Sequence, residues 1–70
     1  MKKNKFAKNI KELREQKNIS QKELASELKV SQRVISYWEH GDSEPDLEAL
    51  CRVADYFDVT IDYLVGRSDL

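Results

Sequence analysis

Hydrophobic residues recur along this chain at the three- and four-residue spacing of short amphipathic helices. The pattern predicts five helices: the first ends near residue 17, the second covers about 21–28, the third follows Ser31, the fourth follows Asp46, and a short fifth follows Thr60. The inward-facing sets of the first four helices are Phe6, Ile10 and Leu13; Leu24, Ala25 and Leu28; Val34, Ile35 and Trp38; Leu47, Leu50, Cys51, Ala54 and Phe57. No segment carries a convincing strand pattern, so we expect an all-α, compact five-helix domain.

Local capping signals mark where these helices begin and end. Ser20 is followed three residues later by Glu23, which predicts a capping box at the start of the second helix. Ser31 can cap the third helix, and Gly41 ends it. Only residues 29–31 separate the two helices, and so short a link cannot fully reverse the chain. The two helices are therefore expected to meet at a steep angle, as in a helix-turn-helix.

The composition is that of a folded domain, with 36% charged and 40% hydrophobic residues, two glycines and one proline. We expect a single domain over residues 1–70, ordered over about 5–66 and located in the cytoplasm. No apolar run is long enough for a secretory signal or a membrane helix. A single cysteine, Cys51, permits no internal disulfide, and no metal or other cofactor is expected.

Charge is distributed unevenly along the chain. Residues 1–17 carry seven basic and two acidic residues, a balance of +5, whereas residues 39–70 carry two basic and nine acidic residues, a balance of −7. If one end faces a polyanion, the acidic end should therefore face away from it. The sequence contains no paired catalytic carboxylates, no cysteine and histidine constellation and no glycine-rich phosphate loop, so we do not expect an enzyme.

The stretch SQKELASELKVSQRVISYWEHG, residues 20–41, resembles the helix-turn-helix of the phage-repressor and Cro-like family, also called the xenobiotic-response-element family. The resemblance runs from about residue 10 to residue 66 and includes, in order, I-x-x-L-R, S-Q-x-E-L-A, V-S-Q, I-S-x-W-E-x-G, E-P-D-L and D-Y-L-x-G. It implies a lambda-repressor-like DNA-binding domain with its helix-turn-helix at about Gln21–His40. The function it implies is that of a sequence-specific transcription regulator, most often a repressor, that occupies a palindromic double-stranded DNA operator as a homodimer.

The residues of the motif and the resemblance together suggest roles for single positions. The positions that match base-facing ones are Gln32, Arg33, Ser36 and Tyr37, whose side chains suit adenine, guanine or a thymine methyl. The residues expected at phosphates are Gln21, Ser31 and His40, together with Lys8 if the start of the first helix approaches the backbone. The residues expected to be structural are Arg14 and Glu39, as a buried ion pair, and Ala25, Val30, Ile35 and Trp38, in the packing of the motif.

Simpler interpretations remain for several of these residues. Gln32 and Arg33 are ordinary first-turn surface residues if the motif is set aside, and the Tyr37 ring can pack along its own helix. His40 suits plain solvent exposure as well as a phosphate contact. Lys29 stands where a glycine is common in the family, which predicts a strained residue if the backbone there needs a positive φ.

A dimer is expected because one recognition helix touches too few bases for specificity. The last helix carries an apolar surplus, from which we take the candidate interface: Ile61, Tyr63, Leu64 and Val65. The alternative is that these residues close the core of the monomer. A second function from another class is a protein-interaction module, antitoxin-like or a co-regulator, with weak or no independent DNA binding. It would bind a regulatory protein partner through exposed acidic residues: Asp42, Asp55, Asp58 and Asp62.

Overall fold

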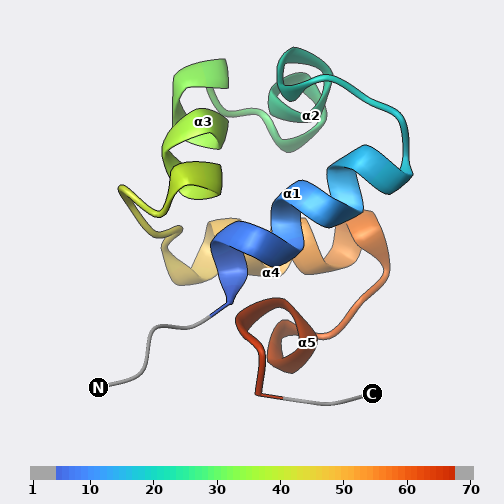
Figure 1. The fold of residues 1–70 in the computed structure, drawn as a ribbon, viewed down its shortest axis with the longest axis vertical. Coiled ribbons are helices and arrows are strands. Elements are labelled where there is room, and N and C mark those ends of the chain that lie inside the picture. Colours follow the sequence, from blue (N-terminus) through green and yellow to red (C-terminus); the bar gives the residue numbers. More distant parts are fainter. Residues whose placement is uncertain (1–4, 68–70) are drawn as a thin grey trace.

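Five α-helices with short connections make up the computed structural model, which describes residues 5–67 (Figure 1). The helices are α1 (Phe6–Gln16), α2 (Gln21–Leu28), α3 (Gln32–His40), α4 (Leu47–Phe57) and α5 (Ile61–Val65). Within the described range no residue belongs to a strand. The all-α, five-helix fold predicted from the hydrophobic pattern is confirmed, and the predicted helix boundaries agree to within about a residue.

Side-chain caps define the starts of four of these helices. The Ser20 hydroxyl accepts the Glu23 backbone N–H at 3.0 Å, and the Glu23 carboxylate accepts the Ser20 N–H at 2.8 Å. This reciprocal pair is the predicted capping box. Ser31, Asp46 and Thr60 each accept one backbone N–H in the first turn of α3, α4 and α5. Each cap satisfies an amide that would otherwise lack a partner, so the start of each helix is set by its own sequence.

The chain leaves each of the five described helices through a residue with positive φ. These residues are Asn18, Lys29, Gly41, Asp58 and Gly66, with φ between 56° and 82°. At the end of α2 the Lys29 N–H donates to the Ser26 carbonyl at 3.3 Å, and the Val30 N–H donates to the Ala25 carbonyl at 3.0 Å. This is a Schellman-type ending, which usually places glycine at the left-handed residue. Lys29, with φ 61°, is therefore the strained lysine that the sequence predicted.

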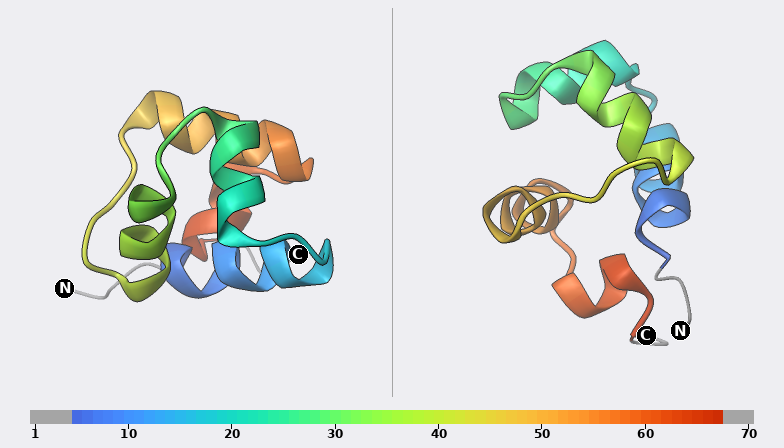
Figure 2. Two further views of the ribbon diagram at one scale, coloured as in Figure 1. Left: turned by 90° about the horizontal axis from the view of Figure 1, so that it is seen from above. Right: turned by 90° about the vertical axis from the view of Figure 1, so that its left-hand side faces the viewer.

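The core lies where the α2–α3 pair meets α1 and α4. Figure 1 and the right-hand view of Figure 2 show α2 and α3 together at one end of the molecule, with α5 closing the opposite end. Ten hydrophobic residues are at most 5% exposed, and they are Phe6, Ile10, Leu24, Ala25, Leu28, Ile35, Trp38, Val53, Ala54 and Leu64. Phe6 and Trp38 meet edge to face, with ring centroids 5.9 Å apart. Ala25, Ile35 and Trp38 are buried in this core, and Val30 is half-buried against it.

Two of the five residues predicted to face inward on α4 are wrong, whereas Ala54 is buried and Leu50 and Phe57 pack against the core. Leu47 is 73% exposed and Cys51 is exposed, although both were expected in the core. The fully buried position is Val53, which was not in the predicted set. Two residues apart on a helix point to almost opposite sides, so turning Val53 inward turns Cys51 outward. The buried residues of α4, Val53 and Ala54, both lie in its second half, which leaves Leu47 uncovered in the first turn.

α5 is held against the start of α1 by backbone and amide hydrogen bonds. The Asn9 side-chain amide donates to the carbonyls of Tyr63 and Leu64, each at 3.0 Å, and the Lys5 backbone N–H donates to Val65 at 3.1 Å. Leu64 is fully buried, so its assignment to a dimer interface is wrong: it is a residue of the monomer core. The other three proposed interface residues are half-buried and retain exposed surface.

Candidate nucleic-acid interface

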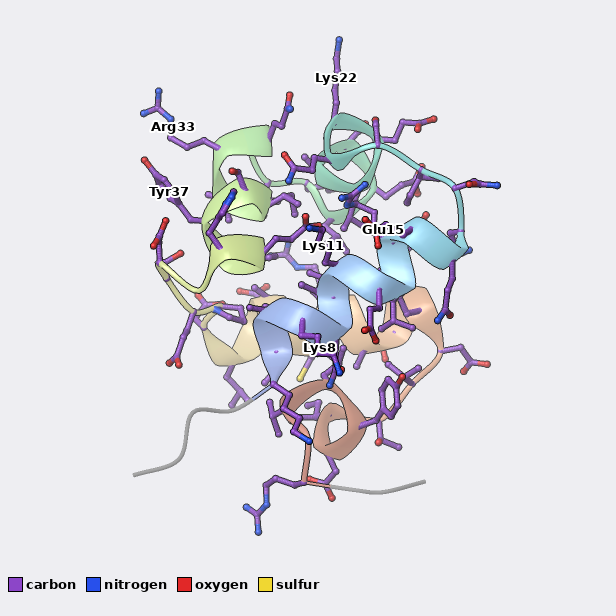
Figure 3. The ribbon with its side chains drawn as sticks, viewed as in Figure 1. Lys8, Lys11, Glu15, Lys22, Arg33 and Tyr37 are labelled. Atoms are coloured by element: carbon purple, nitrogen blue, oxygen red, sulfur yellow. The ribbon has the colours of Figure 1, made fainter. Side chains whose placement is uncertain are left out.

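α3 has two faces of opposite character. Ile35 and Trp38, at 0% and 4% exposure, anchor it to the core. Gln32, Arg33 and Tyr37 are exposed on the rest of the helix, and Figure 3 shows Arg33 and Tyr37 extending to the same side of the molecule. Amide, guanidinium and phenol groups are thus displayed together on one short helix that needs none of them for its packing. Such groups can form hydrogen bonds with base edges in a major groove.

The fourth predicted base-facing residue, Ser36, is half-buried, and the His40 ring contacts it one turn further along the helix. The His40 Nδ1 lies 2.7 Å from the Ser36 carbonyl oxygen and 3.4 Å from the Ser36 hydroxyl. A carbonyl can only accept, so Nδ1 carries the proton of that hydrogen bond. The Nε2 atom of His40 then has a proton to offer a phosphate only when the ring is the charged imidazolium.

The end of α3 is tied to α1 by a buried ion pair. Arg14 Nε lies 2.6 Å from Glu39 Oε2, and Arg14 Nη2 lies 3.1 Å from Glu39 Oε1. The Glu39 side chain is 3% exposed and that of Arg14 is 13% exposed. The hydrogen bonds that Arg14 donates to the Glu39 carboxylate raise the pKa of Arg14 above its ordinary value. The structure thus brings Arg14 and Glu39 together as an ion pair between α1 and α3.

Two residues predicted to contact phosphates occupy the starts of the two helices of the motif. Gln21 is the first residue of α2, and its side-chain amide donates to Glu39 Oε1 at 3.0 Å. Ser31 precedes α3, and its hydroxyl accepts the Val34 N–H at 3.2 Å, which leaves the hydroxyl proton available to a further acceptor. Helix starts favour anions because unpaired N–H groups point outward there.

Lys8 lies apart from these residues. It is on α1, its Nζ is 3.8 Å from Glu12 Oε2, and in Figure 3 it points away from Arg33. The sequence reasoning did not single out Lys22, an exposed residue one position after Gln21 in α2. Figure 3 shows Lys22 projecting from the same end of the molecule as Arg33. Its place next to a residue expected at a phosphate was the signal that could have identified it.

Other classes of site find no support in the described part of the chain. No cluster of three or more histidine, cysteine, aspartate or glutamate side chains within residues 5–67 is arranged to hold a metal ion. None of the helices in that range is long and apolar enough to cross a bilayer. The steep α2–α3 pair is fixed from behind by Arg52, whose Nη1 donates to the Leu28 carbonyl at the end of α2 at 2.8 Å.

This arrangement defines the class of protein: it is a helix-turn-helix domain of the DNA-binding type, with α2 and α3 as the motif. The chain belongs to the Cro/C1-type helix-turn-helix family, since residues 10–64 match the family described as Helix-turn-helix. The family resemblance drawn from the sequence motifs is thereby confirmed.

Known proteins similar to this chain include regulators of transcription. The HTH-type transcriptional activator BcrR of Enterococcus faecalis is 40% identical over 65 residues, which cover 93% of this chain and 32% of BcrR. A transcriptional regulator from Listeria innocua has a similar structure, with 33% identity and a TM-score of 0.89, over 99% of this chain and 64% of that one. The P22 c2 repressor in complex with a synthetic operator is 28% identical with a TM-score of 0.84, over 90% of this chain and 96% of that one. The chain spans between 32% and 56% of the lengths of the curated relatives it matches.

Proposed function

We propose that this protein is a sequence-specific transcription regulator that places α3 in the major groove of double-stranded DNA. The observation that carries the proposal is the one-sided burial of α3, which leaves Gln32, Arg33 and Tyr37 exposed and without a role in packing. A structural relative, the P22 c2 repressor, is named as a complex with an operator, which supports DNA as the partner. A regulator of this kind needs no active site. We place the protein in the cytoplasm, where it would bind the DNA.

In this arrangement Arg33 and Gln32 make the principal base contacts. Arginine pairs with two acceptors of guanine and glutamine with one donor and one acceptor of adenine. Ser36, which is half-buried, and the exposed Tyr37 lie one turn further along α3 and add an edge contact or a contact to a thymine methyl. Gln21 and Ser31 hold the flanking phosphates from the two helix starts. His40 adds a phosphate contact in its charged form. Lys8, on α1, adds electrostatic attraction to the phosphate backbone.

Dimerisation is part of the proposal, because two half-sites about 34 Å apart multiply the specificity of one short helix. Ile61, Tyr63 and Val65 of α5 keep partial exposure and supply the candidate contact surface. A dimer bound over a promoter blocks polymerase, which makes repression the favoured outcome. BcrR, a similar protein, is named an activator, so the position of the operator rather than the domain itself decides the sign of regulation.

The test is selection of bound sequences from a randomised duplex pool at about 150 mM salt, followed by salt titration on the enriched sequence. We expect a palindrome with half-sites about one helical turn apart. Arg33→Ala should then weaken the selected site about 5- to 100-fold and relax the preference at one base pair, whereas Lys8→Ala should weaken all sequences alike. If no sequence is enriched, the proposal is wrong, and the exposed acidic residues favour the protein-interaction module instead.

A further inference from the structure

We propose that Glu39 is a positioning residue for DNA binding: it orients the side-chain amide of Gln21 so that this amide meets a backbone phosphate at the start of α2. The inference rests on the proposed function, and it concerns how the phosphate contact is built. It gives the buried ion pair a second role beyond holding α1 to α3.

Both oxygens of Glu39 are used, and three donors converge on them. Oε2 accepts Arg14 Nε at 2.6 Å, while Oε1 accepts both Arg14 Nη2 at 3.1 Å and Gln21 Nε2 at 3.0 Å. Arg14 is held in turn by its Nη1, which donates to the Ile19 carbonyl at 2.9 Å. The Glu39 side chain is 3% exposed, and two hydrogen bonds from Arg14 hold its carboxylate in place independently of Gln21. Because the acceptor is a charged carboxylate held in place, the hydrogen bond that it accepts from Gln21 is stronger than one to a neutral group.

The consequence for Gln21 is a fixed orientation of its amide. A glutamine amide has two N–H groups and one oxygen, and Glu39 takes one N–H. The second N–H remains for an acceptor outside the protein, beside the backbone N–H groups of the first turn of α2. Gln21 is half-buried, so its contact with Glu39 is sheltered while the first turn stays accessible. An unrestrained glutamine side chain would lose more rotamer freedom on binding than this one does.

The network also joins the two DNA-facing helices. Glu39 lies in the last turn of α3, the helix that carries Arg33, and Gln21 lies in the first turn of α2. One carboxylate therefore sets where the phosphate donor stands relative to the base-reading side chains. A displaced Gln21 would still allow α3 to fold, but the two helices would no longer contact the duplex in one fixed register.

The first test needs no substitution. Nuclear magnetic relaxation of side-chain amide nitrogens in the free protein compares Gln21 with Gln16 and Gln32, two exposed glutamines of α1 and α3. We expect Gln21 Nε2 to be nearly as ordered as the backbone and the two controls to be mobile. Equal mobility of all three amides would overturn the proposal.

The second test is a binding cycle on a mixed-sequence duplex of about 25 base pairs at about 50 mM salt, because a phosphate contact acts on any sequence. The ion pair is replaced by Arg14→Met/Glu39→Met, an apolar exchange that buried pairs often tolerate without unfolding. Gln21→Ala should weaken binding about 3- to 10-fold in the natural background and less than about 2-fold in the Met/Met background.

Lys8→Ala, which is expected to act on all sequences alike, is the control and should cost the same factor in both backgrounds. An equal cost of Gln21→Ala in both backgrounds would show that Glu39 does not position Gln21, while the proposed function would stand. Failure of the natural protein to bind any duplex would instead refute the proposed function and the inference with it. Circular dichroism on each variant shows that the compared proteins are folded.

Discussion

Lys29 offers a direct test of how the turn of the motif is built. Its backbone is left-handed, with φ 61° and ψ 43°, a conformation that costs a residue with a Cβ about 1 kcal/mol relative to glycine. The hydrogen bonds of this turn come from the backbone N–H groups of Lys29 and Val30, so glycine retains both. Lys29→Gly should therefore stabilise the domain by about 1 kcal/mol, which raises the Tm by about 4–8 °C in a domain of this size.

Thermal unfolding followed by circular dichroism measures this shift, and urea unfolding gives the free energy independently. Lys29→Ala is the matched control, because it removes the same charged side chain but keeps the Cβ. We expect the alanine variant to be no more stable than the natural protein. If Lys29→Gly gains nothing over Lys29→Ala, backbone strain at this residue is not a significant cost and the reasoning fails.

Further predictions concern the helix ends and the surface. Gly66→Ala should destabilise the domain by more than Gly41→Ala in thermal unfolding. Both residues have positive φ, but only a Cβ at Gly66 would meet side-chain carbons of Lys5, at 2.9 Å. Equal losses of stability would contradict this. The exposed Cys51 should react with a thiol reagent in the folded protein nearly as fast as in urea, and protection would show that α4 is turned inward after all. Lys22→Ala should reduce the slope of log affinity against log salt by about one, and unchanged slope would place Lys22 away from the backbone. Lys8 lies on α1, away from Lys22 in Figure 3, so Lys8→Ala should change that slope by less.

The helix boundaries could be predicted because their determinants are local. Ser20 and Glu23 cap each other within one turn, and such a signal is visible in the sequence without knowledge of the rest of the fold. The face of α4 could not be predicted in the same way. Leu47 and Cys51 fit a helical stripe as well as Val53 does, and the choice among them depends on how α4 is rotated against its neighbours.

The candidate site could likewise be predicted only in part from the sequence. The exposed face of α3 followed from the positions of Ile35 and Trp38, because burying them turns Arg33 outward. The hydrogen bond between Gln21 and Glu39 joins residues 18 positions apart, and it exists only because α2 and α3 meet at a steep angle beside α1. No periodicity records such a contact. It required the three-dimensional arrangement.

Because α3 has an anchoring face and an exposed face, the residues that stabilise the fold are separate from those that would determine the DNA sequence preference. Exchanging Gln32, Arg33 and Tyr37 for other polar residues removes no core contact, because all three side chains lie on the exposed face. A library built at these positions should therefore yield folded domains with new base preferences. A single ancestral domain of this kind could give rise to many regulators through changes confined to a few surface codons.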